Sequence, residues 1–97
     1  MQRGGCVYIL TNFENNVLYI GVTSELFFRA KEHRDKLYTK SFTAKYNLFK
    51  LVYFKQFITI EEAIAEEKRL KNWKRQWKIN LINSSNPNWD DLFHEID

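Results

Sequence analysis

The sequence contains few of the residues that stabilise a fold covalently or through a metal. It has one cysteine, Cys6, and two histidines, His33 and His94. A single thiol cannot form an internal disulfide, and this set is too small for a structural zinc site. Three glycines and one proline in 97 residues also argue against a fibrous or disordered chain. The chain is therefore expected to fold, with packing as the source of its stability.

Long hydrophobic runs are absent as well. No apolar stretch approaches the roughly 20 residues that a bilayer-spanning helix needs, and Met1–Gly5 leads into a strand-like run rather than into the apolar segment of a signal peptide. We therefore expect a cytoplasmic protein with no membrane partner. A length of 97 residues suits one modest hydrophobic core, so the predicted organisation is a single domain over residues 1–97.

Net charge does not identify a partner, but the distribution of charge is informative. A formal net charge of +3 and an isoelectric point near 9.0 are common in proteins that never bind nucleic acid. Within residues 68–78, however, six side chains are Lys or Arg. This stretch is either a solvated helix surface or a phosphate-binding surface. The second interpretation, with the separate Lys45, gives the nucleic-acid-binding candidates Lys45, Lys68, Lys71, Lys74, Arg75 and Lys78.

Two β-branched and aromatic runs near the N-terminus predict an antiparallel hairpin. They are Cys6–Thr11 and Val17–Val22, separated by the polar residues 12–16. A first helix is expected next, with Ser24 as its N-cap, Glu25 complementing the helix dipole, and apolar residues at helical spacing to about residue 38. The N-terminal part is thus predicted as strand, strand and helix.

The middle of the chain predicts a loop and then a third strand. Residues 42–47 lack a clear period and are expected to form the loop. Residues 49–57 are typical of a strand whose successive side chains face opposite sides, with one pair on each face: Leu51 and Tyr53 on one, Val52 and Phe54 on the other. This strand completes the β-structure that the pattern predicts.

A long second helix is predicted over residues 60–80, with Thr59 as its N-cap. Its apolar stripe follows the spacing of one helix face and consists of Ala63, Ile64, Leu70, Trp73, Trp77 and Leu81. The tail has turn chemistry and then a short apolar cluster expected to pack on the body: Trp89, Leu92 and Phe93. The order ββαβα favours an α+β fold, a small antiparallel sheet covered by helices, over a doubly wound parallel sheet.

Three polar side chains interrupt the core-facing stripes of the two predicted helices. Arg29 and His33 lie on the same side of the first helix as Leu26, and Glu67 lies three residues after Ile64 on the second. Burying a charge costs several kcal/mol unless it is paired or binds a metal. A functional site is one explanation. The alternative is that Glu67 pairs with a lysine four residues later, Arg29 extends to solvent, and His33 is a hydrogen-bonded residue at the core edge.

Two tyrosines lie on facing strands of the predicted hairpin. Tyrosines on strands are usually half-buried packing residues, so Tyr8 and Tyr19 do not indicate a site when taken separately. Gly21 shares the face of Tyr19, two residues on, and is expected to leave space beside that ring for a ligand. The tyrosines become informative only together with the polar residues of the helices.

This ordered set resembles the GIY-YIG nuclease superfamily. The motifs are Val7-Tyr8, Tyr19-Ile20-Gly21, Arg29 with His33, and Glu67 ahead of Leu70-Lys71. The similarity covers nearly the whole chain. Five further segments are similar to small stand-alone bacterial members, relatives of the excision-repair and intron-homing catalytic domains: Tyr8–Asn12, Leu18–Thr23, Phe42–Asn47, Leu51–Tyr53 and Asn86–Leu92.

The resemblance implies a three-stranded antiparallel sheet flanked by helices and a shallow catalytic face formed by Tyr8, Tyr19, Arg29, His33 and Glu67. By the same analogy Glu67 holds one divalent metal ion, Mg²⁺ or Mn²⁺, which keeps most of its waters. Tyr8 takes the proton from the attacking water, with its pKa lowered from about 10 by Arg29 and the metal. Arg29 also binds the charge that develops on the phosphate. His33 and Tyr19 orient Tyr8 or the water.

Three positions bear on how closely the chain follows the family pattern. Cys6 and Val7 replace the Gly and Ile that would precede the first tyrosine, so an altered strand start is expected. Val22 stands where the excision-repair branch carries a lysine, so help from that lysine is absent. Asn86 is a candidate for a late asparagine that some members use, and its alignment stays open.

The function implied by the resemblance is a metal-dependent endonuclease acting on DNA, with a role in repair or recombination. The chain has no separate DNA-reading domain, so a partner protein is a possible source of specificity. An alternative is a catalytically weak nucleic-acid-binding or adaptor module. A third interpretation, a protein-interaction domain, would use its tryptophans as anchors: Trp73, Trp77 or Trp89.

Overall fold

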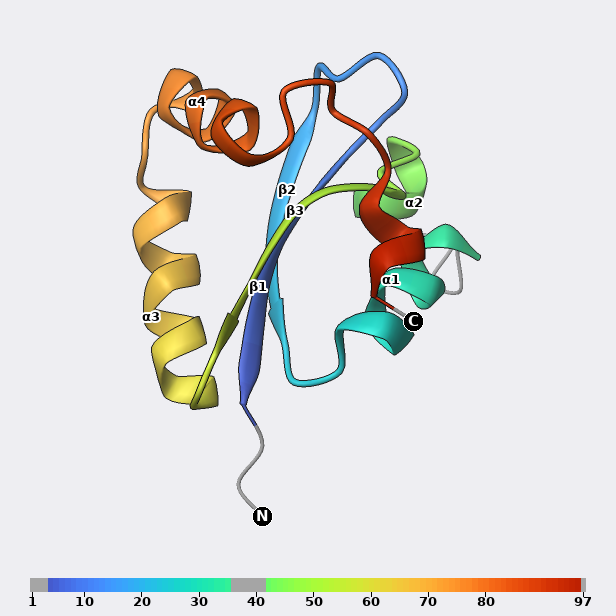
Figure 1. Ribbon diagram of the computed structural model, residues 1–97. Helices are drawn as coiled ribbons and strands as arrows, with labels where there is room; N and C mark the ends of the chain where they lie inside the picture. The colour runs from blue at the N-terminus through green and yellow to red at the C-terminus, as the bar shows by residue number, and fades with distance from the viewer. Residues whose placement is uncertain (1–3, 36–41, 97) are drawn as a thin grey trace.

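The computed structural model describes residues 4–35 and 42–96, in which three antiparallel strands form one sheet with helices on both faces (Figure 1). The strands are β1 (Gly5–Thr11), β2 (Leu18–Thr23) and β3 (Lys50–Phe57), and their order in the sheet is β2-β1-β3. The helices are α1 (Leu26–Arg34), α2 (Phe42–Lys45), α3 (Ile60–Lys71), α4 (Arg75–Ser85) and the 3₁₀ helix η1 (Leu92–Glu95). The expected α+β fold with a three-stranded antiparallel sheet is confirmed.

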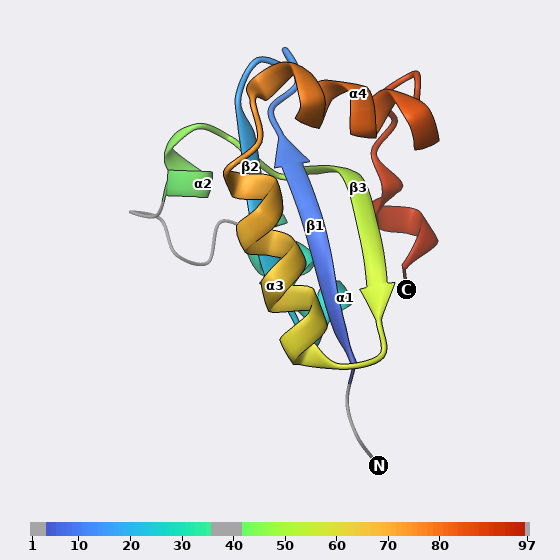
Figure 2. The ribbon, with the colours of Figure 1, turned by 90° about the vertical axis from the view of Figure 1, so that its left-hand side faces the viewer.

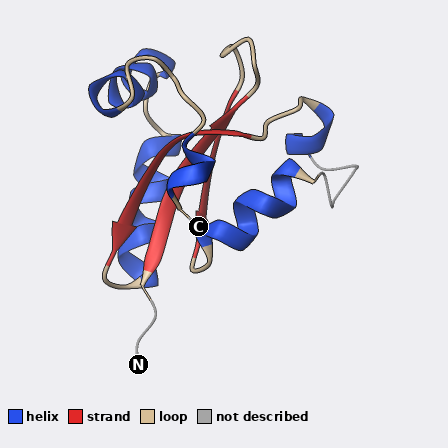
Figure 3. Cartoon of the chain, turned by 45° about the vertical axis from the view of Figure 1, so that its right-hand side comes forward, coloured by secondary structure: helices blue, strands red, loops and turns tan. Residues whose placement is uncertain are grey.

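The central strand β1 separates two hydrophobic clusters. All seven of its residues are buried. Val7 and Ile9 face α3, where they pack with Leu70 and Ala63. Tyr8 and Leu10 face the other way, into a smaller cluster against which Leu26 of α1 and Leu92 of η1 pack. The two sides of the sheet are visible in Figure 3, with α3 behind it and α1 in front. Tyr8 therefore lies on the α1 side, within reach of that helix.

A bulge in β3 overturns the expected alternation of that strand. Ile9 pairs with Tyr53 and Leu10 pairs with Leu51, which leaves Val52 as an extra residue. Val52 and Tyr53 consequently share one cluster, while Leu51 and Phe54 belong to the other. The expectation that Leu51 and Tyr53 share a face was wrong because four consecutive apolar side chains carry no mark of an inserted residue.

The start of α1 and the segment after it also differ from expectation. The N-cap of α1 is Glu25, with no side-chain cap hydrogen bond, so Ser24 is not the cap; Thr23 Oγ1 accepts the Glu25 N–H at 3.0 Å instead. The helix ends at Arg34, and its predicted extension to residue 38 lies outside the described residues. The predicted loop over 42–47 contains α2, a single turn too short to show a helical period.

The predicted helix over residues 60–80 is two helices. Thr59 caps α3 as expected, since its Oγ1 accepts the Glu62 N–H at 3.2 Å. The chain then leaves helical geometry between Asn72 and Lys74, and α4 crosses the end of the sheet (Figure 2). Four members of the predicted apolar stripe face the core, Ala63, Leu70, Trp73 and Leu81, whereas Ile64 and Trp77 are exposed. On α4 the buried residue is Ile82. With no Gly or Pro at the junction, composition gave no indication of the turn.

The C-terminal tail packs on the body, as predicted. Trp89 packs against the α3-side cluster and Leu92 against the other. The ring of Phe93 stacks on Phe27 of α1 with centroids 5.6 Å apart. No helix among the described residues is long and apolar enough to cross a membrane.

An ion pair ties this tail to the rest of the molecule. Arg34 Nη2 of α1 bonds Asp91 Oδ2 at 2.5 Å, and Asp91 Oδ1 accepts the N–H groups of Leu51 and Phe93 at 3.2 and 3.1 Å. Burial alone would raise the pKa of Asp91, but the Arg34 hydrogen bond and the two backbone bonds hold it below its usual value. One carboxylate thus joins α1, β3 and η1.

Asp91→Asn is expected to lower the free energy of unfolding by about 1–2 kcal/mol at neutral pH, because it removes a partly exposed charge-assisted bond while keeping the side-chain shape. Since the folded pKa is depressed, this stabilisation is present above the unfolded carboxyl pKa of about 3.9 and is lost as pH falls through the folded value. Urea unfolding at neutral and acid pH measures it. A difference between wild type and variant that grows toward acid would contradict the account.

Candidate active site

The site begins with a close approach between the first two strands. Tyr8 of β1 pairs with Gly21 of β2, and the Tyr8 ring lies over that glycine. A Cβ added to Gly21 would stand 2.4 Å from both Cζ and Oη of Tyr8. The space beside Tyr19 that Gly21 was expected to leave for a ligand is therefore filled by the Tyr8 phenol. Gly21 is needed for its small size, and its φ is not positive.

Three rings meet above this glycine. Tyr19 of β2 and His33 of α1 stand 6.3 and 6.0 Å from the Tyr8 ring, centroid to centroid, and 5.8 Å from each other. The Tyr8 hydroxyl lies 3.3 Å from Nε2 of His33. Residues 25 positions apart in the sequence are thus joined by a hydrogen bond, because α1 packs on the face of the sheet that carries Tyr8.

Burial controls the protonation of this hydrogen bond. It raises the pKa of Tyr8 above its usual value; Tyr19 adds to the rise, and the positive charge of Arg29 opposes it without overcoming it. Arg29 thus acts in the expected direction, but its charge lowers the Tyr8 pKa by less than burial raises it. Burial and then Arg29 also lower the pKa of His33. At neutral pH a neutral phenol thus faces a neutral imidazole, whose Nε2 can accept the phenolic O–H.

Arg29 reaches this cluster through its charge. It acts on both Tyr8 and His33, as the direction of their pKa shifts shows. Its side chain is 43% exposed, and its Nε lies 3.7 Å from Oε1 of Glu32, one turn along α1. A guanidinium at the rim, beside a buried phenol, is accessible to a phosphate from solvent.

Glu67 approaches from the opposite side of the sheet. It stands on α3, which lies over β1 and β2 (Figure 2), and its carboxylate acts electrostatically on Tyr8. Its Oε2 is 3.1 Å from Nζ of Lys71, so the pairing anticipated as the structural alternative is present. The side chains are 15% and 52% exposed, respectively. The pair therefore opens to solvent and is not sealed inside the core, and such pairs are weak.

Among the five predicted site residues, Glu67 carries the one carboxylate that could bind a metal ion. Among residues 4–35 and 42–96, no three His, Cys, Asp or Glu side chains gather into a ligand cluster. The donor set offers one partly buried carboxylate whose neighbour Lys71 is exposed and can move away. One oxygen ligand fits Mg²⁺ or Mn²⁺, hard cations that keep several waters, and does not fit a metal needing a nitrogen or sulfur cage.

The basic candidates lie apart from Tyr8 on the helices. Lys68, Lys71, Lys74 and Arg75 are exposed along α3 and the start of α4, and Lys78 is half-buried. Arg75 also donates to the Asn16 carbonyl at 2.7 Å, which fixes α4 to the β1–β2 loop. Lys45 on α2 is exposed as well. Five of the six thus follow one another along the end of α3 and the first turn of α4.

Asn86 has a structural role. It is 5% exposed, and its Nδ2 donates to the carbonyls of Val52 and Asp90 at 3.1 and 2.9 Å, while its Oδ1 accepts the Asp90 N–H at 3.1 Å. The amide therefore holds the tail against the β3 bulge. Val22, where a lysine was considered, packs half-buried against the α3-side cluster.

The strand start, where an alteration was expected, depends on Gly5. β1 begins at Gly5, and a Cβ there would lie 2.7 Å from Ala63 Cβ and 2.8 Å from Ile60 Cδ1. Cys6 follows as a buried residue whose pKa is raised to about 11 by burial, so its thiol stays protonated. Gly5 thus allows α3 to approach the sheet closely, a role that the sequence did not single out.

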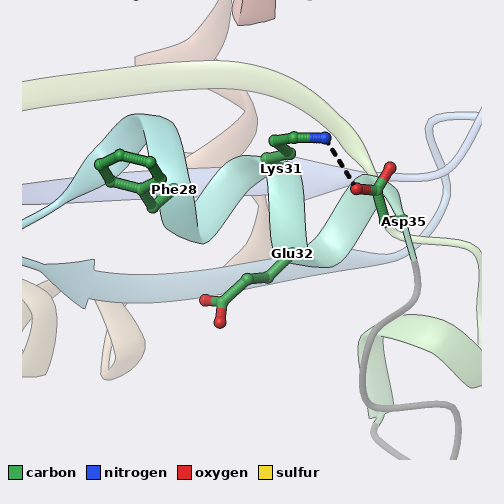
Figure 4. Close-up of a pocket in the computed structure, with 4 residues that line it drawn as sticks. All are labelled: Phe28, Lys31, Glu32 and Asp35. Carbon is green, nitrogen blue, oxygen red and sulfur yellow. Dashed lines mark hydrogen bonds and ion pairs between the residues drawn. The ribbon is translucent and has the colours of Figure 1, made fainter.

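Glu32 is a further participant that the sequence did not single out. Its charge opposes that of Arg29 at His33 and raises the Tyr8 pKa. It also lines a hollow of about 240 Å³ on α1 with Phe28, Lys31 and Asp35 (Figure 4). Lys31 bonds Asp35 at 3.0 Å there. The spacing of Glu32, three residues after Arg29, was the available clue.

Comparison with known proteins adds evidence independent of this geometry. The sequence model described as the GIY-YIG catalytic domain matches residues 4–80. The UPF0213 protein of Oceanobacillus iheyensis is 38% identical over 86 residues, which cover 84% of this chain and 93% of that relative. Its name states no activity. No solved structure matches the chain.

The geometry predicts opposite effects of two substitutions on the titration of His33. Arg29→Gln should raise the His33 pKa, because it removes a positive charge, and Glu32→Gln should lower it further, because it removes a negative one. The wild-type pKa should be below 6.5. Following the His33 ring-proton shifts by NMR across pH measures all three. Equal or same-direction shifts in the two variants would show that these charges do not reach the ring.

Proposed function

Because the chain belongs to the GIY-YIG family, whose members are nucleases, we propose that it is a metal-dependent endonuclease that hydrolyses phosphodiester bonds of DNA. The observation that carries the proposal is the cluster of Tyr8, Tyr19 and His33 over Gly21, under the charges of Arg29 and Glu67. Those five side chains come from four elements, and each has a chemical part to play in phosphoryl transfer.

Tyr8 is proposed as the general base, acting through His33. Water attacks phosphorus and loses its proton to the phenolic oxygen, while the phenolic proton passes to Nε2 of His33. The bond from phosphorus to the 3′ oxygen breaks, which leaves a 5′ phosphate, and the 3′ oxygen takes up a proton from solvent to become a hydroxyl. This relay suits a buried phenol, because a phenol with a raised pKa does not ionise in advance and needs an acceptor for its proton. Tyr19 holds the two rings in place.

Arg29 and Glu67 are proposed to stabilise negative charge during cleavage, Arg29 directly and Glu67 through a bound metal ion. The guanidinium of Arg29 binds the phosphate oxygens, on which negative charge grows during the attack. Glu67 would hold Mg²⁺ or Mn²⁺, and an ion bound there would supply Lewis-acid polarisation of a phosphate oxygen and charge stabilisation for the leaving oxygen. Lys71 neutralises Glu67 when no cation is bound, which keeps a partly buried carboxylate paired.

Phosphate contacts are assigned to the basic side chains. Five of them follow Glu67 along the end of α3 and the first turn of α4: Lys68, Lys71, Lys74, Arg75 and Lys78. Lys45 is a separate contact. Such contacts position a backbone without reading sequence, so sequence specificity is assigned to a partner protein. The cytoplasm, where DNA and Mg²⁺ meet, is the proposed location.

A second candidate function is a catalytically weak module that binds nucleic acid and relies on a partner. The observations that favour it are the raised pKa of Tyr8 and the engagement of Glu67 by Lys71. Both features disfavour the ionised, metal-bound state that fast hydrolysis needs. The module would bind DNA without cutting, and its binding would not change when Glu67 is neutralised.

Nicking of supercoiled, branched and single-stranded DNA with Mg²⁺ or Mn²⁺ distinguishes the two. Tyr8→Phe is expected to lower the rate by about 10²–10⁴, since it removes the proton acceptor. Glu67→Gln should lower it by more than about 10², since it removes the metal ligand.

The matched control is Glu66→Gln, the neighbouring carboxylate, which bonds Arg69 at 2.6 Å and should leave the rate nearly unchanged. Equal losses in the Glu66 and Glu67 variants, or full activity in Tyr8→Phe, would reject the proposed mechanism.

Gly21→Ala tests the packing beneath the tyrosine. The added methyl must displace the Tyr8 phenol from His33, so cleavage should fall at least about tenfold, while overpacking should cost about 1–3 kcal/mol of stability. The neighbouring Val22→Ala, on the other face of β2, is the control and should keep its rate. Rates are compared at a temperature where circular dichroism shows each variant folded. Wild-type activity in folded Gly21→Ala would mean that the position of Tyr8 does not matter.

A further inference from the structure

A hollow of about 340 Å³ lies where α3 gives way to α4. It is lined by Trp73, Trp77, Asn80 and Leu81. Trp73 and Leu81 pack against the core, whereas the Trp77 side is open, with that residue 51% exposed. The break between the two helices brings these residues together, because α4 turns away from the axis of α3 at this point (Figure 1). The hollow is therefore built by the one feature of this region that the sequence pattern did not predict.

Of the two tryptophan rings, that of Trp77 is available for stacking. They meet edge to face, at 86° with centroids 5.8 Å apart. The guanidinium of Arg69 lies 4.6 Å from the centroid of the Trp73 ring and covers it. Trp77 is the more exposed of the pair, and Asn80 stands beside it with an amide whose oxygen accepts from Gln76 at 2.9 Å. A flat group entering here would meet an aromatic face and the NH₂ of an amide.

The stretch that runs from the end of α3 through α4 carries charge of one sign. Residues 68–89 contain six Lys and Arg and no Asp or Glu. The hollow on α1 differs, because two carboxylates, Glu32 and Asp35, line it (Figure 4). Aromatic rings among cations are the combination with which proteins hold single strands, since bases stack on the rings and the cations follow the phosphates.

The hollow is also close to the proposed catalytic carboxylate. Helix α3 ends four residues after Glu67, which is about 6 Å along the helix axis. Lys71, which bonds Glu67, stands at that end of the helix. A strand whose phosphate is at Glu67 therefore needs only a few nucleotides to reach Trp77.

We propose that this hollow binds an unpaired base of the substrate, stacked on Trp77, a few nucleotides from the phosphate that is cut. The inference rests on the proposed nuclease function and adds its substrate class: nucleic acid with unpaired nucleotides next to the cleavage position, such as a flap, a branch or a single strand. Stacking has no sequence preference, because every base has a π-face. The occupant is a nucleotide and not an apolar helix of a partner protein, because the chain from Lys68 through α4 carries cations and no carboxylate.

Anisotropy of labelled DNA tests the proposal, with a chelator present to prevent cleavage. Two probes are compared: a blunt duplex, and the same duplex carrying a single-stranded extension. Wild type is expected to bind the extended duplex roughly tenfold or more tightly than the blunt one. Trp77→Phe, which keeps an aromatic face, should retain most of this preference. Trp77→Leu, which keeps apolar bulk alone, should lose it, and affinity for the blunt duplex should not change in either variant.

The outcomes separate the two levels of the argument. Equal wild-type affinity for both probes would overturn the inference. A preference that survives in Trp77→Leu would also overturn it, because it would indicate a general apolar docking surface such as a protein would use. A parallel nicking assay decides the proposed function. If the protein cuts DNA but Trp77 substitutions have no effect, only the unpaired-base site is rejected. If the protein neither binds nor cuts any DNA, the nuclease function itself is rejected.

Discussion

The phenol of Tyr8 can reach the edge of the sheet only because residue 21 has no side chain. In the β1–β2 register the two residues face each other, and the ring occupies the volume that any Cβ at that position would need. This contact directs the hydroxyl toward His33 of α1 and leaves Tyr19 as the second wall of the ring cluster. The hairpin register, the choice of glycine and the placement of α1 are thus one constraint, and the geometry of the candidate site follows from it.

Burial of Tyr8 both holds the phenol in place and opposes its ionisation. The same packing that fixes Tyr8 raises its pKa, so the charge of Arg29 alone does not make it a base. A neutral imidazole at hydrogen-bond distance offers the missing proton acceptor, and its own pKa is lowered by the same burial. The mechanism that we propose therefore transfers the proton through a pair of neutral groups and does not need a stored phenolate.

The sequence predicted the hairpin, the third strand and the polar residues that interrupt helix faces, because alternation and helical spacing record which side chains face the core. It did not predict the bulge at Val52, since neighbouring apolar residues hide an insertion. It missed the turn at Asn72, where apolar residues continue on both sides because both helices face the same core. The close contact over Gly21 was also out of reach, because it depends on which residues pair across strands. Periodicity shows which face of a helix or strand is buried. The candidate site depends instead on the register between strands and on a change of helix direction.

The central claim is that Glu67 and Tyr8 serve one site, although α3 covers one face of the sheet and the Tyr8 side chain points to the other. Anomalous diffraction from crystals soaked in Mn²⁺ measures this most directly. We predict a single strong peak bonded to the Glu67 carboxylate, with Lys71 displaced from it and the Tyr8 hydroxyl facing the same solvent-filled space. A crystal saturated with Mn²⁺ in which Glu67 still bonds Lys71, or in which the ion lies on other residues away from Tyr8 and Arg29, would contradict the account.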